Sequence, residues 1–144
     1  MTNQEKKKWL RRYLDLNGAI NQKILELDAV RSLCEKVTPS YSGMPQAPGS
    51  STKDNSYLRL VTMSQKIDRE IDQYVDMRKE IQTAINTVGD IRLRTILALR
   101  YINGMKFDEI AVKMNYDYTW IWRLHGYALS KIKIPQQQKK AGPP

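Results

Sequence analysis

The fold is decided by residues 103–132, which read NGMKFDEIAVKMNYDYTWIWRLHGYALSKI. Two short amphipathic segments, 107–114 and 118–132, stand on either side of Asn115. Asparagine is one of the few non-glycine residues that tolerate a positive φ, so Asn115 can turn the chain sharply. Ala111 is small enough to let the second helix cross closely over the first. The stretch therefore predicts a helix-turn-helix, whose second helix lies in the major groove of DNA.

The second of these helices has two faces when its residues are spaced at about 100°. One face is apolar and is expected to form a small core; it consists of Ile121, Leu124, Ala128 and Ile132. The opposite side, called here the polar face, consists of Thr119, Arg123, Gly126 and Ser130. Arg123 can form a bidentate pair with guanine, and Thr119 can contact a thymine methyl group. The polar face therefore has the chemistry of base recognition.

Basic and aromatic residues surround this helix. Lysine side chains can contact phosphates, which position a protein on DNA without reading sequence; the candidates are Lys106, Lys113, Lys131 and Lys133. Lys139 and Lys140 of the tail can add affinity that depends on salt. The aromatic residues Trp120, Trp122 and Tyr127 are either core or interface residues or contacts to nucleic acid, and the sequence leaves both interpretations open.

Upstream, apolar residues recur every three or four positions over 4–37 and again over 57–88, which predicts two long helices. Segment 38–56, TPSYSGMPQAPGSSTKDNS, is rich in proline, glycine and serine and is predicted to be a flexible connector. The two apolar stripes are expected to pack together in an antiparallel hairpin. A hairpin has only one thin seam, so packing on a second copy, and hence a homo-oligomer, is a live hypothesis.

These elements predict an all-α protein of two domains. A helical hairpin spans 1–88, a helix-turn-helix domain spans 89–134, and a basic disordered tail spans 135–144. Asp90 is expected to cap a supporting helix over 91–102, and Asp117 to cap the second helix of the motif.

Charge and composition limit the class of partner. The chain of 144 residues has a formal net charge of +9, and residues 90–144 hold 10 basic and 4 acidic side chains. This excess favours a polyanion such as double-stranded DNA. No apolar run reaches the ~20 residues of a membrane span, and the single cysteine cannot form an internal disulfide. We therefore expect a cytoplasmic protein with no membrane partner.

The residues required for catalysis are largely missing from the sequence. It has one histidine, His125, one cysteine, no glycine-rich phosphate loop and no Cys/His spacing suited to zinc. His125 is predicted to be a partly exposed polar residue at the edge of the second helix. We expect a protein that is not an enzyme and that has no catalytic residue, metal site or cofactor.

The stretch from Leu97 to Ile132, LALRYINGMKFDEIAVKMNYDYTWIWRLHGYALSKI, resembles region 4 of the sigma-70 factors. The likeness is to the variant in late-gene regulators of the ArpU and RinA type, which phages of Gram-positive bacteria encode. It implies a transcriptional regulator of phage or mobile-element genes that binds a promoter-like site, with host RNA polymerase as a further partner.

The resemblance also implies roles for single residues. By position, Tyr118, Thr119 and Arg123 match the base-reading residues of that family. Trp120 and Trp122 stand where sigma factors usually carry arginine or another polar residue. Nothing in the chain resembles sigma region 2, so the resemblance does not extend to a complete sigma factor.

Two other functions fit the same pattern. A small terminase subunit, which packages phage DNA, also joins a helix-turn-helix to helical oligomerisation segments, although such subunits usually carry the motif at the N-terminus. A protein-interaction module could use the sigma-like fold to bind RNA polymerase without reading DNA.

Overall fold

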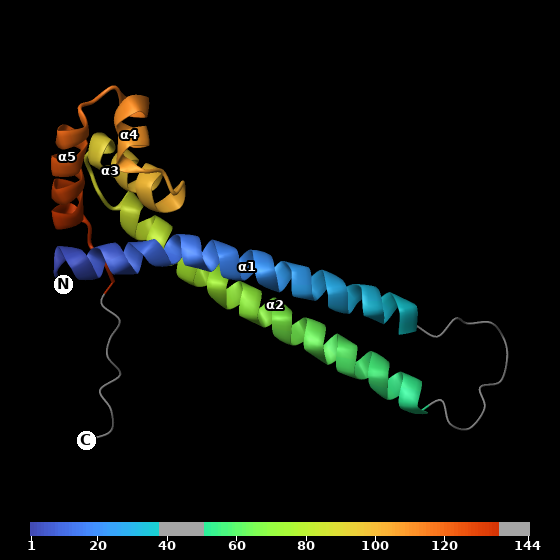
Figure 1. Ribbon diagram of the computed structural model, residues 1–144. Coiled ribbons are helices and arrows are strands. Elements are labelled where there is room, and N and C mark those ends of the chain that lie inside the picture. Colours follow the sequence, from blue (N-terminus) through green and yellow to red (C-terminus); the bar gives the residue numbers. More distant parts are fainter. Residues whose placement is uncertain (38–50, 136–144) are drawn as a thin grey trace, which may run out of the picture. The chain divides into compact units, whose positions relative to one another are not determined.

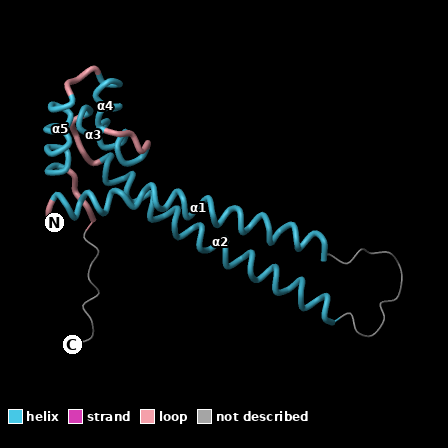
Figure 2. Tube along the Cα trace, viewed as in Figure 1, coloured by secondary structure: helices cyan, strands magenta, loops and turns pink. Residues whose placement is uncertain are grey.

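The computed structural model describes residues 1–37 and 51–135, which form helices and contain no strand (Figures 1 and 2). In chain order the helices are α1 (Asn3–Val37), α2 (Ser51–Asn86), α3 (Ile91–Leu97), the π-helix η1 (Ala98–Ile102), α4 (Phe107–Met114) and α5 (Tyr118–Lys131). The predicted all-α class is confirmed. None of the helices in these two stretches combines the length and the apolar content needed to cross a membrane.

The second long helix begins earlier than predicted. α2 starts at Ser51, so residues 51–56, which were predicted to belong to the connector, are helical. The physical reason is local, because Pro48 and Gly49 are the last helix-breaking residues before α2. The rest of the predicted connector, 38–50, lies outside the described residues, as does the tail from residue 136.

The chain divides into two compact units, and the division differs from the predicted boundary after residue 88. Unit 1 comprises Met1–Asn17 and Asp76–Pro144, and unit 2 comprises Gly18–Val75. Both long helices therefore contribute to both units. The first turns of α1 belong with the C-terminal helices because they contact them directly: the Lys6 ammonium donates a hydrogen bond to the Leu129 carbonyl, 2.7 Å away.

Unit 1 has a core drawn from each of its α-helices. The following apolar side chains are less than 2% exposed: Leu10, Ile81, Ile85, Ile96, Leu97, Ile110, Ile121 and Leu129. Burying a side chain of this size stabilises a fold by about 1.5–3 kcal/mol. This core holds α4 and α5 in place and thereby fixes which side of α5 faces solvent.

The supporting helix predicted over 91–102 consists of two parts. Its start is as predicted, because the Asp90 side chain accepts a hydrogen bond from the Arg92 amide at 2.9 Å. After Leu97 the helix widens into η1, where the Asn103 amide donates to the Ala98 carbonyl at 3.0 Å. Tyr101, within η1, is only 3% exposed.

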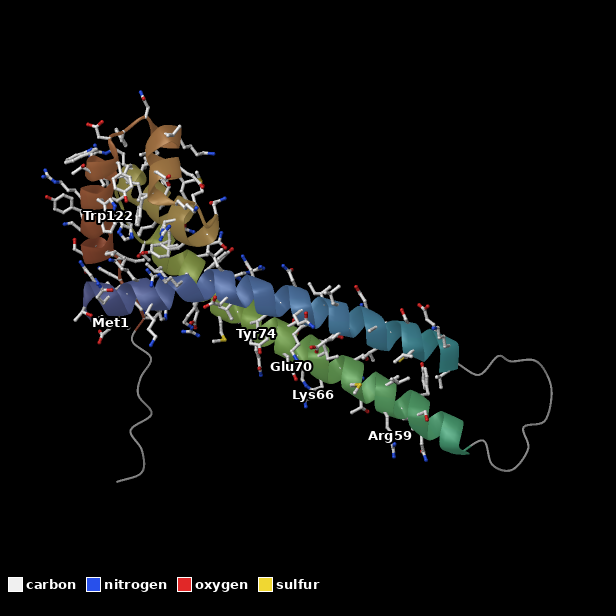
Figure 3. The ribbon with its side chains drawn as sticks, in the orientation of Figure 1. Met1, Arg59, Lys66, Glu70, Tyr74 and Trp122 are labelled. Carbon is white, nitrogen blue, oxygen red and sulfur yellow. The ribbon has the colours of Figure 1, made fainter. Side chains whose placement is uncertain are left out.

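The described part of unit 2 is an antiparallel pair of helical segments from α1 and α2 (Figure 1). Its core consists of Leu27, Val30 and Ile67, with Cys34, Leu60 and Ile71 partly buried against them. Lys23 of α1 forms an ion pair of 2.6 Å with Glu70 of α2, which Figure 3 labels. Ile24, which the spacing of three or four positions places on the predicted apolar stripe of 4–37, is 41% exposed, so the stripe is wrong at this residue.

Candidate nucleic-acid interface

The turn before α5 has the predicted geometry. Asn115 has φ 59° and ψ 45°, so the expected positive φ is confirmed. The Tyr116 amide donates to the Ala111 carbonyl at 3.0 Å, and Ala111 is buried. Asp117 occupies the N-cap position of α5, but its side chain makes no capping hydrogen bond, contrary to prediction. A left-handed residue thus ends α4 and sets the direction of α5.

α5 buries one side and exposes the other. Its buried residues are Ile121, Leu124, His125, Ala128 and Leu129. On the polar face, Thr119, Arg123 and Ser130 are exposed, and Gly126 is half-buried. A shallow hollow lies at the start of this face, lined by Asp117, Tyr118, Thr119, Trp120 and Arg123. The three residues predicted to read bases are therefore brought together at one accessible surface.

Three aromatic residues that the sequence could not assign to the core or to an interface are all partly exposed. The exposed fractions are 39% for Trp120, 45% for Trp122 and 57% for Tyr127. Trp122, labelled in Figure 3, packs on Phe107 of α4 with ring centroids 4.9 Å apart. Its ring lies 6.4 Å from that of Tyr118, which is itself 50% exposed. Trp122 therefore packs against α4 while keeping nearly half of its surface accessible at the border of the polar face.

The four predicted phosphate contacts are exposed but are not all equivalent. Lys106 and Lys113 stand at the two ends of α4, and Lys131 lies in the last turn of α5. Lys133 instead lines a groove beside α2, together with acidic residues such as Asp76. This groove shares no lining residue with the hollow on the polar face, so we regard the other three lysines as the better candidates.

The predicted exposure of His125 is wrong. His125 is 2% exposed rather than partly exposed, and its Nε2 lies 2.7 Å from the Tyr101 hydroxyl. Burial lowers the pKa of His125 to about 4, helped by the positive charges of Lys7, Arg100 and Arg11. Burial likewise raises the pKa of Tyr101 to about 12. Both groups are neutral at pH 7. His125 therefore packs on the buried side of α5 and adds no charge to the surface.

Arg100, Phe107 and His125 pack against one another on the buried side of α5. The Arg100 guanidinium lies 4.3 Å from the Phe107 ring centroid and donates to the Met105 carbonyl at 3.0 Å. The Phe107 ring meets His125 edge-on, with centroids 4.8 Å apart. In residues 1–37 and 55–135, no group of three or more His, Cys, Asp or Glu side chains is arranged to hold a metal ion.

One known protein family matches most of the chain, including α4 and α5. Residues 38–133 match the family described as "Protein of unknown function (DUF1492)". The chain belongs to the DUF1492 family. The matched range includes α4, α5 and the whole polar face, whereas α1 lies outside it. No curated protein and no solved structure matches the chain significantly.

The part of α1 that contacts α5 lies outside the range matched to the DUF1492 family, and sequence reasoning missed it. Besides the hydrogen bond from Lys6 to Leu129, the Lys7 ammonium lies over the Trp122 ring, 5.9 Å from its centroid. The run KKKWLRR is visible in the sequence, but no local signal shows which other helix it contacts. In this DUF1492 protein the helix that carries the candidate site is therefore contacted by residues from the start of the chain.

Proposed function

We propose that this DUF1492 protein binds double-stranded DNA in a sequence-specific manner, with α5 in the major groove. The observation that carries the proposal is the exposed polar face of α5, presented by the left-handed turn at Asn115. An α-helix fits the major groove, and side chains near the N-terminus of a recognition helix reach base edges. The α4 and α5 pair then acts as a helix-turn-helix.

The residues at the start of the polar face, and the lysines around it, have distinct chemical roles in this proposal. The Arg123 guanidinium can donate two hydrogen bonds to guanine O6 and N7, and Thr119 can contact a thymine methyl group or a hydrogen-bonding edge. Tyr118 lies at the same end of the helix and lines the same hollow. The lysines Lys106, Lys113 and Lys131 supply contacts to phosphates. The resemblance to sigma region 4 supports a promoter-like target in phage or mobile-element genes.

Selection from a randomised DNA library tests this proposal. Wild-type protein should enrich a defined sequence, and Arg123→Ala should lose preference at one base pair, because a bidentate contact contributes about 1–3 kcal/mol of discrimination. Arg123→Lys keeps the charge but not the planar fork, so it should lose the same preference. Arg59→Ala removes an exposed arginine from unit 2 and is the matched control. Equal selectivity in the three variants would contradict base reading by Arg123.

A protein partner is the second candidate for the same surface. It is favoured by the aromatic residues Tyr118, Trp120, Trp122 and Tyr127, which are 39–57% exposed, because aromatic side chains are enriched in protein interfaces. RNA polymerase is the partner that the sigma-like resemblance suggests. The protein should then be retained on immobilised polymerase, and Trp120→Ala should abolish this retention. If the protein also gives no gel shift on random DNA, these results would favour a protein partner over DNA reading.

A homo-oligomer through unit 2 is also proposed. Leu25, Ala29 and Leu33 follow one another every four residues on α1, and Leu25 and Leu33 are 64% and 47% exposed. Unit 2 has 7 basic and 7 acidic residues, so a second copy meets no net repulsion. Leu25→Glu should lower the association measured by sedimentation equilibrium. Leu58→Glu, at a leucine of α2 that is 59% exposed, should not.

A further inference from the structure

The first turns of α1 form a dense basic segment beside α5. Five basic residues lie within seven positions: Lys6, Lys7, Lys8, Arg11 and Arg12. Lys6 is engaged structurally, because its ammonium donates to the Leu129 carbonyl in the last turn of α5. A cation at that end of a helix is favourable, since the last carbonyls carry partial negative charge. Lys6 is therefore a positioning residue that holds α1 against α5.

The remaining cations of this segment have no acidic partner among the side chains that the structure describes. No ion pair within 4.0 Å joins any of them to a carboxylate in residues 1–37 and 55–135, where the ion pairs involve Lys23, Arg31 and Arg92. Their positive charge extends beneath α5, since Lys7 and Arg11 help to lower the pKa of His125. Closely spaced like charges repel one another, so this clustering is unfavourable unless an anion neutralises it.

The segment borders the polar face at Trp122. Trp122 stands one residue before Arg123 on α5, and the Lys7 ammonium lies over its ring. Arg11 follows Lys7 by one helical turn and is exposed, and the neighbouring Lys8 is exposed as well. When a helix lies in the major groove, the two phosphate backbones flank it, so a basic helix at its border is placed to contact one of them.

We propose that the first turns of α1 bind the phosphodiester backbone of the same DNA duplex that α5 reads, through Lys7, Lys8 and Arg11. The inference rests on the proposed function and adds a second DNA-contacting element that lies outside the range shared with the family. These contacts add affinity for any sequence and do not change the preferred one, because phosphates are the same at every base pair.

Salt dependence of binding tests the inference. The double variant Lys8→Gln with Arg11→Gln should reduce the slope of log affinity against log salt by about 0.9 for each lost phosphate contact. The measurement uses the selected duplex and a random duplex of equal length, and both should weaken by the same factor. The matched control is Lys66→Gln with Arg59→Gln, which removes one exposed lysine and one exposed arginine from unit 2 and should leave the slope unchanged.

Three further results separate the possible outcomes. The charge-preserving variant Lys8→Arg with Arg11→Lys should retain the wild-type slope, because the slope depends on the number of cations that contact phosphates. If Arg123→Ala alters base preference but the glutamine variant keeps the full slope, the α1 contact is wrong and the reading function stands. If the wild-type protein does not bind the duplexes at all, both proposals are wrong.

Discussion

The two units differ in charge and in backbone regularity. Unit 1 contains 17 basic and 8 acidic residues, whereas unit 2 contains 7 of each, so the whole net charge of +9 belongs to unit 1. Unit 1 also holds the π-helix, the left-handed residues Asn115 and Gly104, and the buried pair of Tyr101 and His125. The described residues of unit 2 form two regular helical segments. Among the described residues, the departures from regular helix therefore occur in the same unit as the unbalanced charge.

The units also differ in how their charges are paired. In unit 2 the ion pairs of Lys23 with Glu70 and of Arg31 with Asp68 join the two helices. The first of these raises the pKa of Lys23 and lowers the pKa of Glu70, chiefly through the hydrogen bond between the two side chains. Most cations of unit 1 have no such partner among the described residues. Charge thus supports pairing of helices in unit 2 and remains available to an external anion in unit 1.

Acid should destabilise unit 1 more than unit 2, through His125. An unfolded histidine has a pKa near 6.5, and the folded pKa is about 4. The unfolded state therefore binds the proton more strongly between these values, and the free energy of unfolding falls as the pH decreases from 6.5 to 4. The loss should be at most about 1.4 kcal/mol per pH unit and roughly 3 kcal/mol in total.

Two measurements isolate this effect. The three tryptophans, Trp9, Trp120 and Trp122, all belong to unit 1, so denaturation followed by tryptophan fluorescence reports on that unit. In the double variant Tyr101→Phe with His125→Phe, the pH dependence between 6.5 and 5 should largely disappear. NMR titration of the single imidazole in the native protein gives its pKa directly. A value near 6.5 would contradict the buried neutral histidine.

The sequence predicted the elements of unit 1 that depend on local signals. α4 spans the predicted residues 107–114, and α5 ends within one residue of its predicted end, because Asn115 and the apolar spacing act within a few residues. The exposure of Thr119 and Arg123 followed from the same helical period. Helical periodicity thus predicted most of the core of the α4 and α5 pair and the exposure of its candidate site, but not the burial of His125 and Leu129.

Features that depend on distant contacts were not predicted. The burial of His125 requires Tyr101, a residue 24 positions away, and the contact of Lys6 with Leu129 spans 123 positions. The π-helix has no local signal in the sequence, since the widened turn is compatible with ordinary helix-forming residues. The early start of α2 was missed for a different reason, because serine, threonine and aspartate before a helix were assigned to the connector.

The turn at Asn115 provides a smaller test within unit 1. Asn115→Ala should reduce the free energy of unfolding by about 1–2 kcal/mol, because alanine lacks the short polar side chain whose local hydrogen bonding makes a positive φ tolerable for asparagine. Asn115→Gly should be close to neutral, since glycine, with no Cβ, adopts this conformation readily. Thermal denaturation followed by tryptophan fluorescence measures both variants. Equal losses in both would show that the asparagine side chain, and not the backbone conformation, stabilises the turn.

The smallest effect should have opposite signs in the two units. Gly18 lies within α1 in unit 2, and an added Cβ there meets nothing within 4 Å, so Gly18→Ala should stabilise the helix by up to about 1 kcal/mol. Gly104 in unit 1 has φ 70°, and its Cβ would lie 3.3 Å from Leu14 Cδ1. Gly104→Ala should therefore destabilise the protein, by about 1 kcal/mol.

Replacing one glycine with alanine in each unit thus tests whether unit 2 is a regular, open helix pair and whether unit 1 depends on the positive φ of Gly104. Helix content followed by circular dichroism during heating reports on both units, and tryptophan fluorescence reports on unit 1. Gly18→Ala should raise the midpoint seen by circular dichroism at a concentration where the chain does not self-associate. A loss of stability in Gly18→Ala would mean that α1 is not a regular, solvent-facing helix at this position. The contrast between a regular unit 2 and an irregular unit 1 would then not hold at Gly18.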